Sequence, residues 1–350
     1  MCSFTLLIGM LLGYSRRVMR LARVVVFTLI FCAATLGHAA SYKYKRQGSD
    51  LDAQTRTEPG LAMMGGGVDV DEAFRWLCGK GHGGDFLILR ARGKFDYNGY
   101  VNKVCQMNSV ATLIIPDRKA AQEPRVAKII GQATVIFIAG GDQSHYIESW
   151  KGTPVQDALN AHVIADKPIG GSSAGLAVLG EFVYAALDDK GNDDDLTSSE
   201  VLANPYAKRV TLVRDFLKAP GLDNMITDSH FAKRDRMGRG LGFLARIEAD
   251  GWSKHPREIA VDEKSAVLME VDGRAKVMGM GRGAYFLQLA EPPEVCKPGQ
   301  PLTLRNVAVY HAPNGATFDI RRWNGEGGEA YSVSVEAGQV HSSRADKALY

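Results

Sequence analysis

Residues 171–175 have the sequence Gly-Ser-Ser-Ala-Gly, which matches the G-x-S-x-G pattern of a nucleophile elbow. In such a turn a strand ends, the chain reverses and a helix begins, so the central serine, here Ser173, is exposed above the edge of a sheet. The N–H of Ala174 would then lie at a helix N-terminus, where it can stabilise an oxyanion. The pattern predicts a nucleophilic Ser173, with an ordinary tight turn as the alternative.

A serine nucleophile needs a general base. Residues 225–231 form an apolar run that ends in a polar cluster, which places His230 at a strand end downstream of the turn. His145 also lies in a candidate site loop. We predict His230 as the base because its place in the chain suits that role.

The base needs an acid that orients its ring. Asp228 precedes the histidine by two residues, and Asp262 with Glu263 follows the apolar residues 258–261. Spacing alone leaves both alternatives open.

Two glycine clusters, at residues 65–67 and 140–141, follow predicted strands. We predict that the N–H of Gly141 meets that of Ala174 as the second oxyanion donor. A dinucleotide-binding loop would need a third glycine where the chain has Val70, so no nucleotide cofactor is expected.

Apolar strand patterns alternate with helical patterns through this part of the chain. Strands are predicted at residues 60–64, 85–90, 111–115 and 133–139, with helices at residues 70–78, 123–130 and 154–165. The alternation predicts an α/β fold with a doubly wound, mostly parallel sheet. Ligands bind beyond the carboxyl ends of the strands in such sheets, so the glycine clusters and the elbow should meet there.

Composition excludes several classes of protein. The chain has 350 residues, 45% hydrophobic and 23% charged, which is enough to bury one large core. A net charge of +3 is too small to indicate a nucleic-acid partner. The cysteines lack the spacing of a metal site, and no metal or other cofactor is expected.

The amino-terminal residues 1–40 resemble a signal peptide. Arginines between positions 16 and 23 precede the apolar residues 24–36, and small residues follow where a signal peptidase would cleave. We therefore expect export to the periplasm or the medium, without a stable membrane partner. A retained membrane anchor is the alternative.

Three cysteines lie beyond this segment: Cys78, Cys105 and Cys296. An oxidising compartment would allow Cys78 to pair with Cys105 and leave Cys296 free. Buried, unpaired thiols are the alternative, which the sequence slightly favours.

Four motifs in this order resemble those of the cyanophycinases, relatives of dipeptidase E. They are Gly-Gly-Asp-Gln at 140–143, the elbow at 171–175, Asp-Ser-His-Phe at 228–231 with Arg234, Arg236 and Arg239 following, and Ala-Val-Asp-Glu at 260–263. The resemblance spans roughly residues 60–289, and residues 316–338 are similar to the family's small terminal β segment. It implies a fold similar to class I glutamine amidotransferases, with serine replacing cysteine.

The resemblance also implies a serine-type peptidase with a triad of Ser173, His230 and Glu263. Gly141 and Ala174 would form the oxyanion hole, and the reaction would pass through an acyl-enzyme.

The polar residues after the histidine would then select the substrate. Arg234 and Arg239 suit bidentate capture of a carboxylate, and Asp228 would meet an amine or guanidinium. Gln143 would shape the pocket, and Ser229 stands where the family tends to carry glutamine. The implied substrate is an acidic or β-aspartyl peptide such as cyanophycin.

The expected organisation is a signal peptide (1–40), an amino-terminal extension (41–58), an α/β serine peptidase domain (59–290) and a carboxyl-terminal β segment with its tail (291–350). The acidic residues 193–195 are expected in a flap or a solvated loop. A homodimer is compatible with the sequence. Two other functions are weighed against the peptidase: a carboxylesterase-like hydrolase and a non-catalytic binding protein on the same scaffold.

Overall fold

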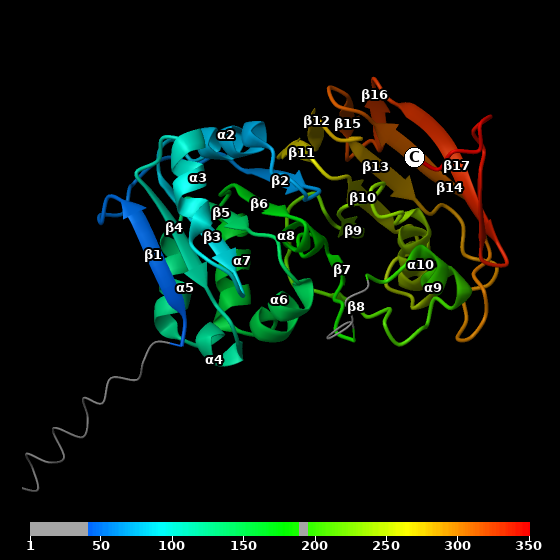
Figure 1. The fold of residues 1–350 in the computed structure, drawn as a ribbon, viewed down its shortest axis with the longest axis horizontal. Coiled ribbons are helices and arrows are strands. Elements are labelled where there is room, and N and C mark those ends of the chain that lie inside the picture. Colours follow the sequence, from blue (N-terminus) through cyan, green and yellow to red (C-terminus); the bar gives the residue numbers. More distant parts are fainter. Residues whose placement is uncertain (1–40, 189–194) are drawn as a thin grey trace, which may run out of the picture. The chain divides into compact units, whose positions relative to one another are not determined.

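The computed structural model describes residues 41–188 and 195–350, which belong to one compact unit (Figure 1). The predicted signal peptide at residues 1–40 lies outside the described residues, as do two of the three aspartates at 193–195. Within the described ranges, no helix has the length and apolarity to cross a membrane.

The first sheet contains the strands predicted around the elbow. Its strand order is β1 (Lys43–Gly48), β4 (Ser109–Ile114), β3 (Asp85–Arg90), β5 (Val135–Ile138), β6 (Ile169–Ser172), β2 (Gly60–Met64), β11 (Ser265–Glu270), β12 (Arg274–Gly279), β15 (Thr317–Asp319) and β16 (Asn324–Glu326). The strands from β4 to β2 are parallel, whereas β1 and the strands from β11 onward pair antiparallel.

Helices cover both faces of the parallel strands (Figure 1). One face packs on α2 (Asp71–Lys80) and α3 (Asp96–Val104), and the other on α4 (Arg118–Ala121), α5 (Pro124–Gln132), α6 (Gln143–Trp150) and α7 (Pro154–Ile164). Because side chains alternate along a strand, Phe86 joins the α2 layer while Leu87 joins the α5 layer.

The second sheet lies beside the first and is mostly antiparallel. Its order is β18 (Gln339–Ser342), β17 (Glu329–Glu336), β14 (Leu304–Ala312), β13 (Ala284–Gln288), β10 (Arg257–Val261), β9 (Met225–Asp228), β7 (Phe182–Tyr184) and β8 (Leu212–Arg214). In the described part of the chain, the parallel pairs of this sheet are β9 with β10 and β9 with β7, and its other pairs are antiparallel. The remaining helices are α8 (Ala174–Ala177), α9 (Ser198–Ala203) and α10 (Met237–Ala249).

The predicted α/β class is confirmed, but the prediction of a mostly parallel sheet is wrong for the second half of the chain. Parallel neighbours need long crossovers, which the helices supply up to β6. Beyond β10 most connections are short turns, such as the one between β11 and β12, and these produce antiparallel hairpins, whereas the longer segment of residues 289–303 connects the antiparallel strands β13 and β14. The carboxyl-terminal residues 291–350 add strands to both sheets, and the extension at 41–58 adds the edge strand β1.

Most predicted elements lie within a few residues of their expected places. The helix predicted at residues 154–165 is confirmed as α7, and a short strand follows it before the elbow. The strand itself, β6, contains only the residues Ile169–Ser172.

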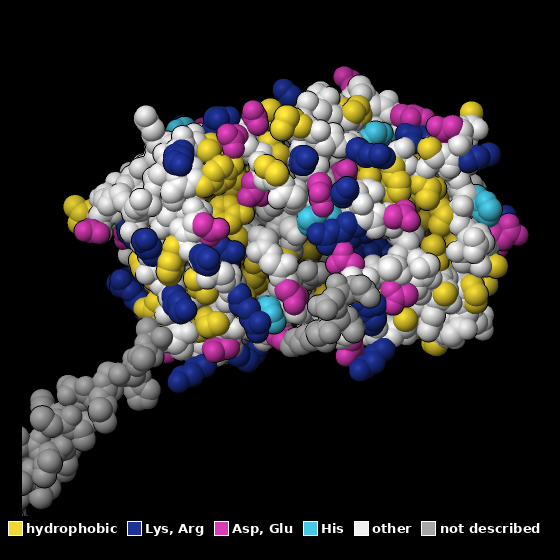
Figure 2. Space-filling model, viewed as in Figure 1, with side chains coloured by type: hydrophobic (Ala, Val, Ile, Leu, Met, Phe, Trp, Pro, Cys, Tyr) yellow, Lys and Arg dark blue, Asp and Glu magenta, His cyan; other side chains and the backbone are white. Residues whose placement is uncertain are grey.

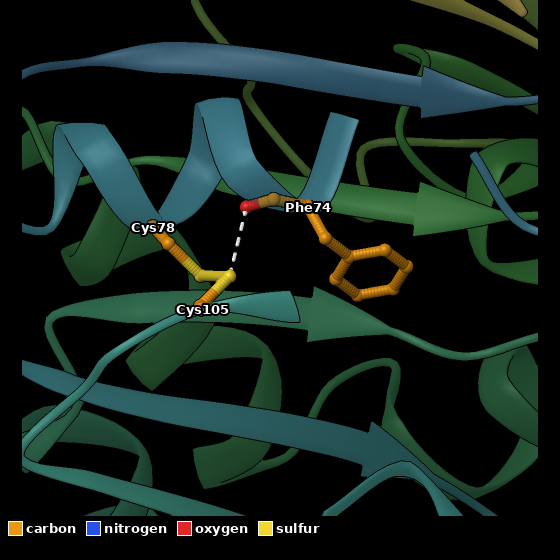
Figure 3. The surroundings of a disulfide bond; sticks show 3 residues. All are labelled: Phe74, Cys78 and Cys105. Carbon is orange, nitrogen blue, oxygen red and sulfur yellow. Dashed lines mark hydrogen bonds between the residues drawn. A yellow bond between two sulfur atoms is a disulfide. The ribbon is translucent and has the colours of Figure 1, made fainter. Parts of the chain in front are cut away.

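A disulfide joins Cys78 of α2 to Cys105, the residue after α3, so the favoured alternative of unpaired thiols is wrong for this pair (Figure 3). The sulfur of Cys105 lies 3.4 Å from the carbonyl oxygen of Phe74. Cys296 is a free thiol.

Candidate active site

Ser173 lies at the sharp turn between β6 and α8. Its backbone has φ 54° and ψ −117°, a conformation that is rare for a residue with a side chain and that structures keep mainly at functional sites. A Cβ on Gly175 would lie 1.9 Å from the carbonyl oxygen of Ile138, so only glycine fits there. The strand, the turn and the short helix are those of a nucleophile elbow.

His230 follows β9 and its side chain meets Ser173. The Oγ of Ser173 lies 2.7 Å from Nε2 of His230. The N–H of His230 donates to the carbonyl oxygen of Gly65. A Cβ on Gly66 would come within 2.5 Å of the histidine ring, so the first glycine cluster permits the loop to pack against His230.

Glu263, just beyond β10, completes a continuous chain of hydrogen bonds. Its Oε1 lies 2.7 Å from Nδ1 of His230. The neighbouring Asp262 instead accepts a hydrogen bond from the N–H of Lys233, and Asp228 bonds to Arg239. Of the acids left open by the sequence, Glu263 is the one in contact with the histidine.

The surroundings keep His230 neutral and Glu263 ionised. Burial lowers the pKa of His230, and the positive charges of Arg234 and Arg236 lower it further, against the opposing effect of Glu263. The hydrogen bond from His230 is the main cause of the lowered pKa of Glu263. A neutral histidine with an ionised partner can accept a proton from Ser173.

Two backbone N–H groups lie beside the serine without an acceptor. Within residues 41–188 and 195–350, neither Gly141 nor Ala174 donates a hydrogen bond from its N–H. Both residues line the same cavity as Ser173. Unused N–H donors beside a candidate nucleophile suit an oxyanion hole.

The cavity beside Ser173 has a volume of about 180 Å³ and a charged lining. The space-filling view shows basic, acidic and histidine side chains together near the middle of one face (Figure 2). The lining includes all five residues predicted to bind substrate: Gln143, Asp228, Ser229, Arg234 and Arg239. His145 lies nearby on α6, 3.7 Å from the carboxylate of Asp142, and does not contact Ser173.

Arg239 and Asp228 form a buried, bidentate ion pair. The Nε and one terminal nitrogen of Arg239 lie 2.8 and 2.6 Å from the two carboxylate oxygens of Asp228. Both side chains are almost fully buried. Arg239 was expected to capture a substrate carboxylate and Asp228 a substrate cation, but each is occupied by the other. In the structure they form the wall of the cavity.

The other two arginines of the lining are Arg234, whose side chain is 41% exposed, and Arg236, which is buried, and both bond to Asp195. The Oδ2 of Asp195 lies 2.7 Å from Arg234 and 2.9 Å from Arg236. Arg236 also donates to the carbonyl oxygen of Ser229. Burial and the neighbouring Arg239 lower the pKa of Arg236 to about 10, so it keeps its charge at neutral pH.

Sequence reasoning missed the roles of Arg236, Asp195 and Gly66 in this cavity. Arg236 lies two residues after Arg234 in the same arginine-rich segment, so the sequence could have predicted it as a cavity residue. Nothing in the sequence links Asp195 to residues about 40 positions downstream. Within the described residues, no cluster of histidine, cysteine and acidic side chains is arranged to hold a metal ion.

Comparisons with known proteins agree with the motifs. The model of peptidase family S51 matches residues 70–202. The chain is 26% identical over 226 residues to a cyanophycinase of Synechococcus elongatus, which covers 61% of this chain and 62% of the relative. It is also 26% identical over 223 residues to a cyanophycinase of Geminocystis herdmanii, covering 61% and 73%. The chain thus spans less than two thirds of the Synechococcus relative.

Two solved structures are also similar to this chain. A peptidase from an acI-B1 Actinobacterium has a TM-score of 0.48 and 17% identity, covering 68% of this chain and 96% of that structure. A putative peptidase E from Listeria monocytogenes EGD-e has a TM-score of 0.41 and 14% identity, covering 64% and 99%. The S51 match, the cyanophycinase relatives and the four ordered motifs together support a cyanophycinase-like, serine-type peptidase of family S51.

Proposed function

We propose that this protein hydrolyses peptide bonds of acidic or β-aspartyl substrates, with Ser173 as nucleophile, His230 as base and Glu263 as the orienting acid. The observation that carries this proposal is the continuous chain of two hydrogen bonds, each 2.7 Å, from Ser173 through His230 to Glu263. Such a chain is the arrangement that makes a serine hydroxyl reactive.

The reaction would proceed in two halves. His230 takes the hydroxyl proton as the Oγ of Ser173 attacks the carbonyl carbon, and Glu263 stabilises the resulting imidazolium. The N–H groups of Gly141 and Ala174 bind the oxyanion. His230 then protonates the leaving amine, and water attacks the acyl-enzyme to release the acid and restore Ser173.

The cationic side of the cavity supports an acidic substrate. Arg234 and Arg236 line the cavity and already bind one carboxylate, that of Asp195. A substrate carboxylate would use the same donors. Similarity to cyanophycinases makes cyanophycin the first candidate, although Ser229 cannot reach as far as the glutamine typical of that family.

We also propose that the protein is exported. The Cys78–Cys105 disulfide supports this proposal, because such bonds persist mainly in oxidising compartments. The charged and apolar pattern of residues 1–40 is the second support.

The activity is tested with cyanophycin, a panel of α- and β-aspartyl dipeptides and a simple ester, with products identified by mass spectrometry. Ser173→Ala should remain folded and lose turnover by about ten-thousandfold or more, and Glu263→Gln should lose about a thousandfold or more. Asp262→Asn is the matched control, because its carboxylate does not contact His230. Near-normal turnover by Ser173→Ala would contradict the nucleophile assignment, and hydrolysis of the ester alone would favour an esterase.

A further inference from the structure

Asp195 occupies the part of the cavity where an incoming carboxylate would bind. Its Oδ2 bonds to both Arg234, which is partly exposed, and Arg236, which is buried in the cavity lining. The next residue, Leu196, is buried in an apolar core that includes residues of α9 and α10. Thr197 then caps the N-terminus of α9 in a capping box with Glu200. The chain is therefore anchored immediately after Asp195, which delivers the carboxylate to the arginines.

Among the residues that the structure describes, three aspartates line the cavity, and they differ in how firmly they are held. Asp228 is buried and bonds to Arg239 through both oxygens. Asp142 caps α6 by accepting from the N–H of Ser144. Asp195 has a side chain that is 49% exposed, so its carboxylate can rotate into water without being stripped of solvation.

The charges of the side chains that line the cavity also indicate a special role for Asp195. Arg234, Arg236 and Arg239 are matched by Asp142, Asp195 and Asp228 while His230 is neutral. Glu258 lies behind the cavity, and burial, with the nearby charge of Asp228, raises its pKa well above the usual value, so it adds no negative charge at neutral pH. When Asp195 turns away, one net positive charge remains among the described side chains that line the cavity, while the ionised Glu263 lies just outside the lining, 3.9 Å from Arg234.

We propose that Asp195 determines specificity as an internal competitor: its carboxylate holds Arg234 and Arg236 until a substrate carboxylate replaces it. A neutral group cannot replace a carboxylate on two arginines at equal strength. Asp195 thereby raises the concentration of acidic substrate needed and excludes uncharged substrates. The inference rests on the proposed function for its biological role, but the competition itself is a property of binding.

The competition is measured by calorimetry with succinate, a probe that carries the aspartyl-type carboxylate, and with succinamide as its uncharged counterpart. Asp195→Asn removes the charge and keeps the shape of the side chain. We expect it to tighten the binding of succinate by about threefold to tenfold, because one exposed, charge-assisted contact no longer has to be broken. Succinamide, which the Asp195 carboxylate excludes from the unsubstituted protein, should also bind more tightly to Asp195→Asn. Melting temperatures establish that each variant is folded.

Asp188→Asn is the matched control. It removes one negative charge from the same stretch of chain, where the carboxylate pairs with Lys208 and does not line the cavity. An equal gain in both variants would show a long-range charge effect and overturn the proposal. Unchanged or weaker succinate binding by Asp195→Asn would also overturn it, as would a failure of succinate to bind any of the proteins.

Failure of the inference and failure of the proposed function give different results. Tighter succinate binding by Asp195→Asn in a protein that hydrolyses none of the peptides leaves the competition standing and removes the peptidase activity. Hydrolysis of aspartyl peptides by the unsubstituted protein, with no change in succinate binding or KM in Asp195→Asn, removes the competition alone.

Discussion

His230 has to accept a proton in a positively charged neighbourhood. Its ring is mostly buried, Arg234 and Arg236 are close, and Glu263 is the carboxylate in direct contact with it. Burial and the arginines together lower the pKa of His230 below the ordinary value of 6.5. The same arginines that would bind an acidic substrate therefore also keep the base ready at mildly acidic pH.

This coupling predicts the pH dependence of the reaction. Because the base must be neutral, kcat/KM should stay high as pH falls to 6.5 and be lost only as pH falls further, through the lowered pKa of His230. Arg234→Gln removes one positive charge and should move this acid limb to higher pH, besides lowering kcat/KM for acidic substrates. The measurement is the pH profile of kcat/KM for both proteins.

Lys208→Gln is the control, because it removes a positive charge from an exposed side chain outside the cavity. An acid limb that moves to lower pH in Arg234→Gln would contradict the prediction.

The free energy of unfolding should depend on pH in the same direction as the activity. A lowered pKa means that the unfolded chain binds the proton more readily, so the contribution of His230 to stability is lost as pH falls below 6.5.

At the scale of single residues, the sequence predicted which side chains lie in the site better than it predicted what each of them contacts. Ser173 and His230 follow from a local turn and a strand end, which are short-range signals. The acid could not be chosen from the residues alone, because Asp228 and Glu263 both lie at the carboxyl ends of strands and their contacts depend on how β9 and β10 pair. The burial of Arg239 against Asp228 likewise depends on the packing of α10 on β9.

At the scale of elements, the helices α2 and α3 are joined covalently on the face of the parallel sheet (Figure 3). The helical pattern of α2 predicted its position, and its buried residues Phe74 and Leu77 pack in the same core as the strands. The prediction of parallel neighbours succeeded where helices connect the strands. It failed beyond β10, because a strand pattern does not reveal whether the next connection is a helix or a hairpin.

The disulfide should stabilise the fold without affecting the chemistry. It closes a loop of 27 residues, so replacing both Cys78 and Cys105 by alanine should lower the free energy of unfolding by about 3 kcal/mol. Neither residue lines the active-site cavity, so kcat/KM should remain within about twofold. Urea unfolding and steady-state kinetics measure the two effects.

The matched control for this pair is Cys296→Ala, which removes the free thiol and leaves the disulfide intact. A similar loss of stability in that variant would show that the effect comes from packing of cysteine side chains. A large loss of activity in the double variant would mean that α2 and α3 also position the glycine loop at residues 65–67.

On the scale of the whole molecule, Tyr350 helps to hold the arginine turn, the segment between β9 and α10 that contains Arg234 and Arg236. The hydroxyl of Tyr350 accepts a hydrogen bond from the N–H of Met237 and donates to Asp235. Its ring packs edge-on against Phe231 and Tyr285. Residues more than 110 positions apart are thus joined on either side of Arg236, a contact that no local sequence pattern predicts.

Tyr350→Phe tests whether this distant contact positions the substrate arginines. The substitution keeps the ring and leaves the N–H of Met237 without its acceptor, which should cost about 1–2 kcal/mol of stability. Because the turn carries Arg234 and Arg236 and not the triad, KM for aspartyl peptides should rise while kcat changes little. Tyr100→Phe is the control: it removes a hydroxyl that donates to Asp71, and neither residue lines the active-site cavity. If kcat fell at constant KM, or if both variants raised KM equally, Tyr350 would act on the fold in general and not through the position of the arginines.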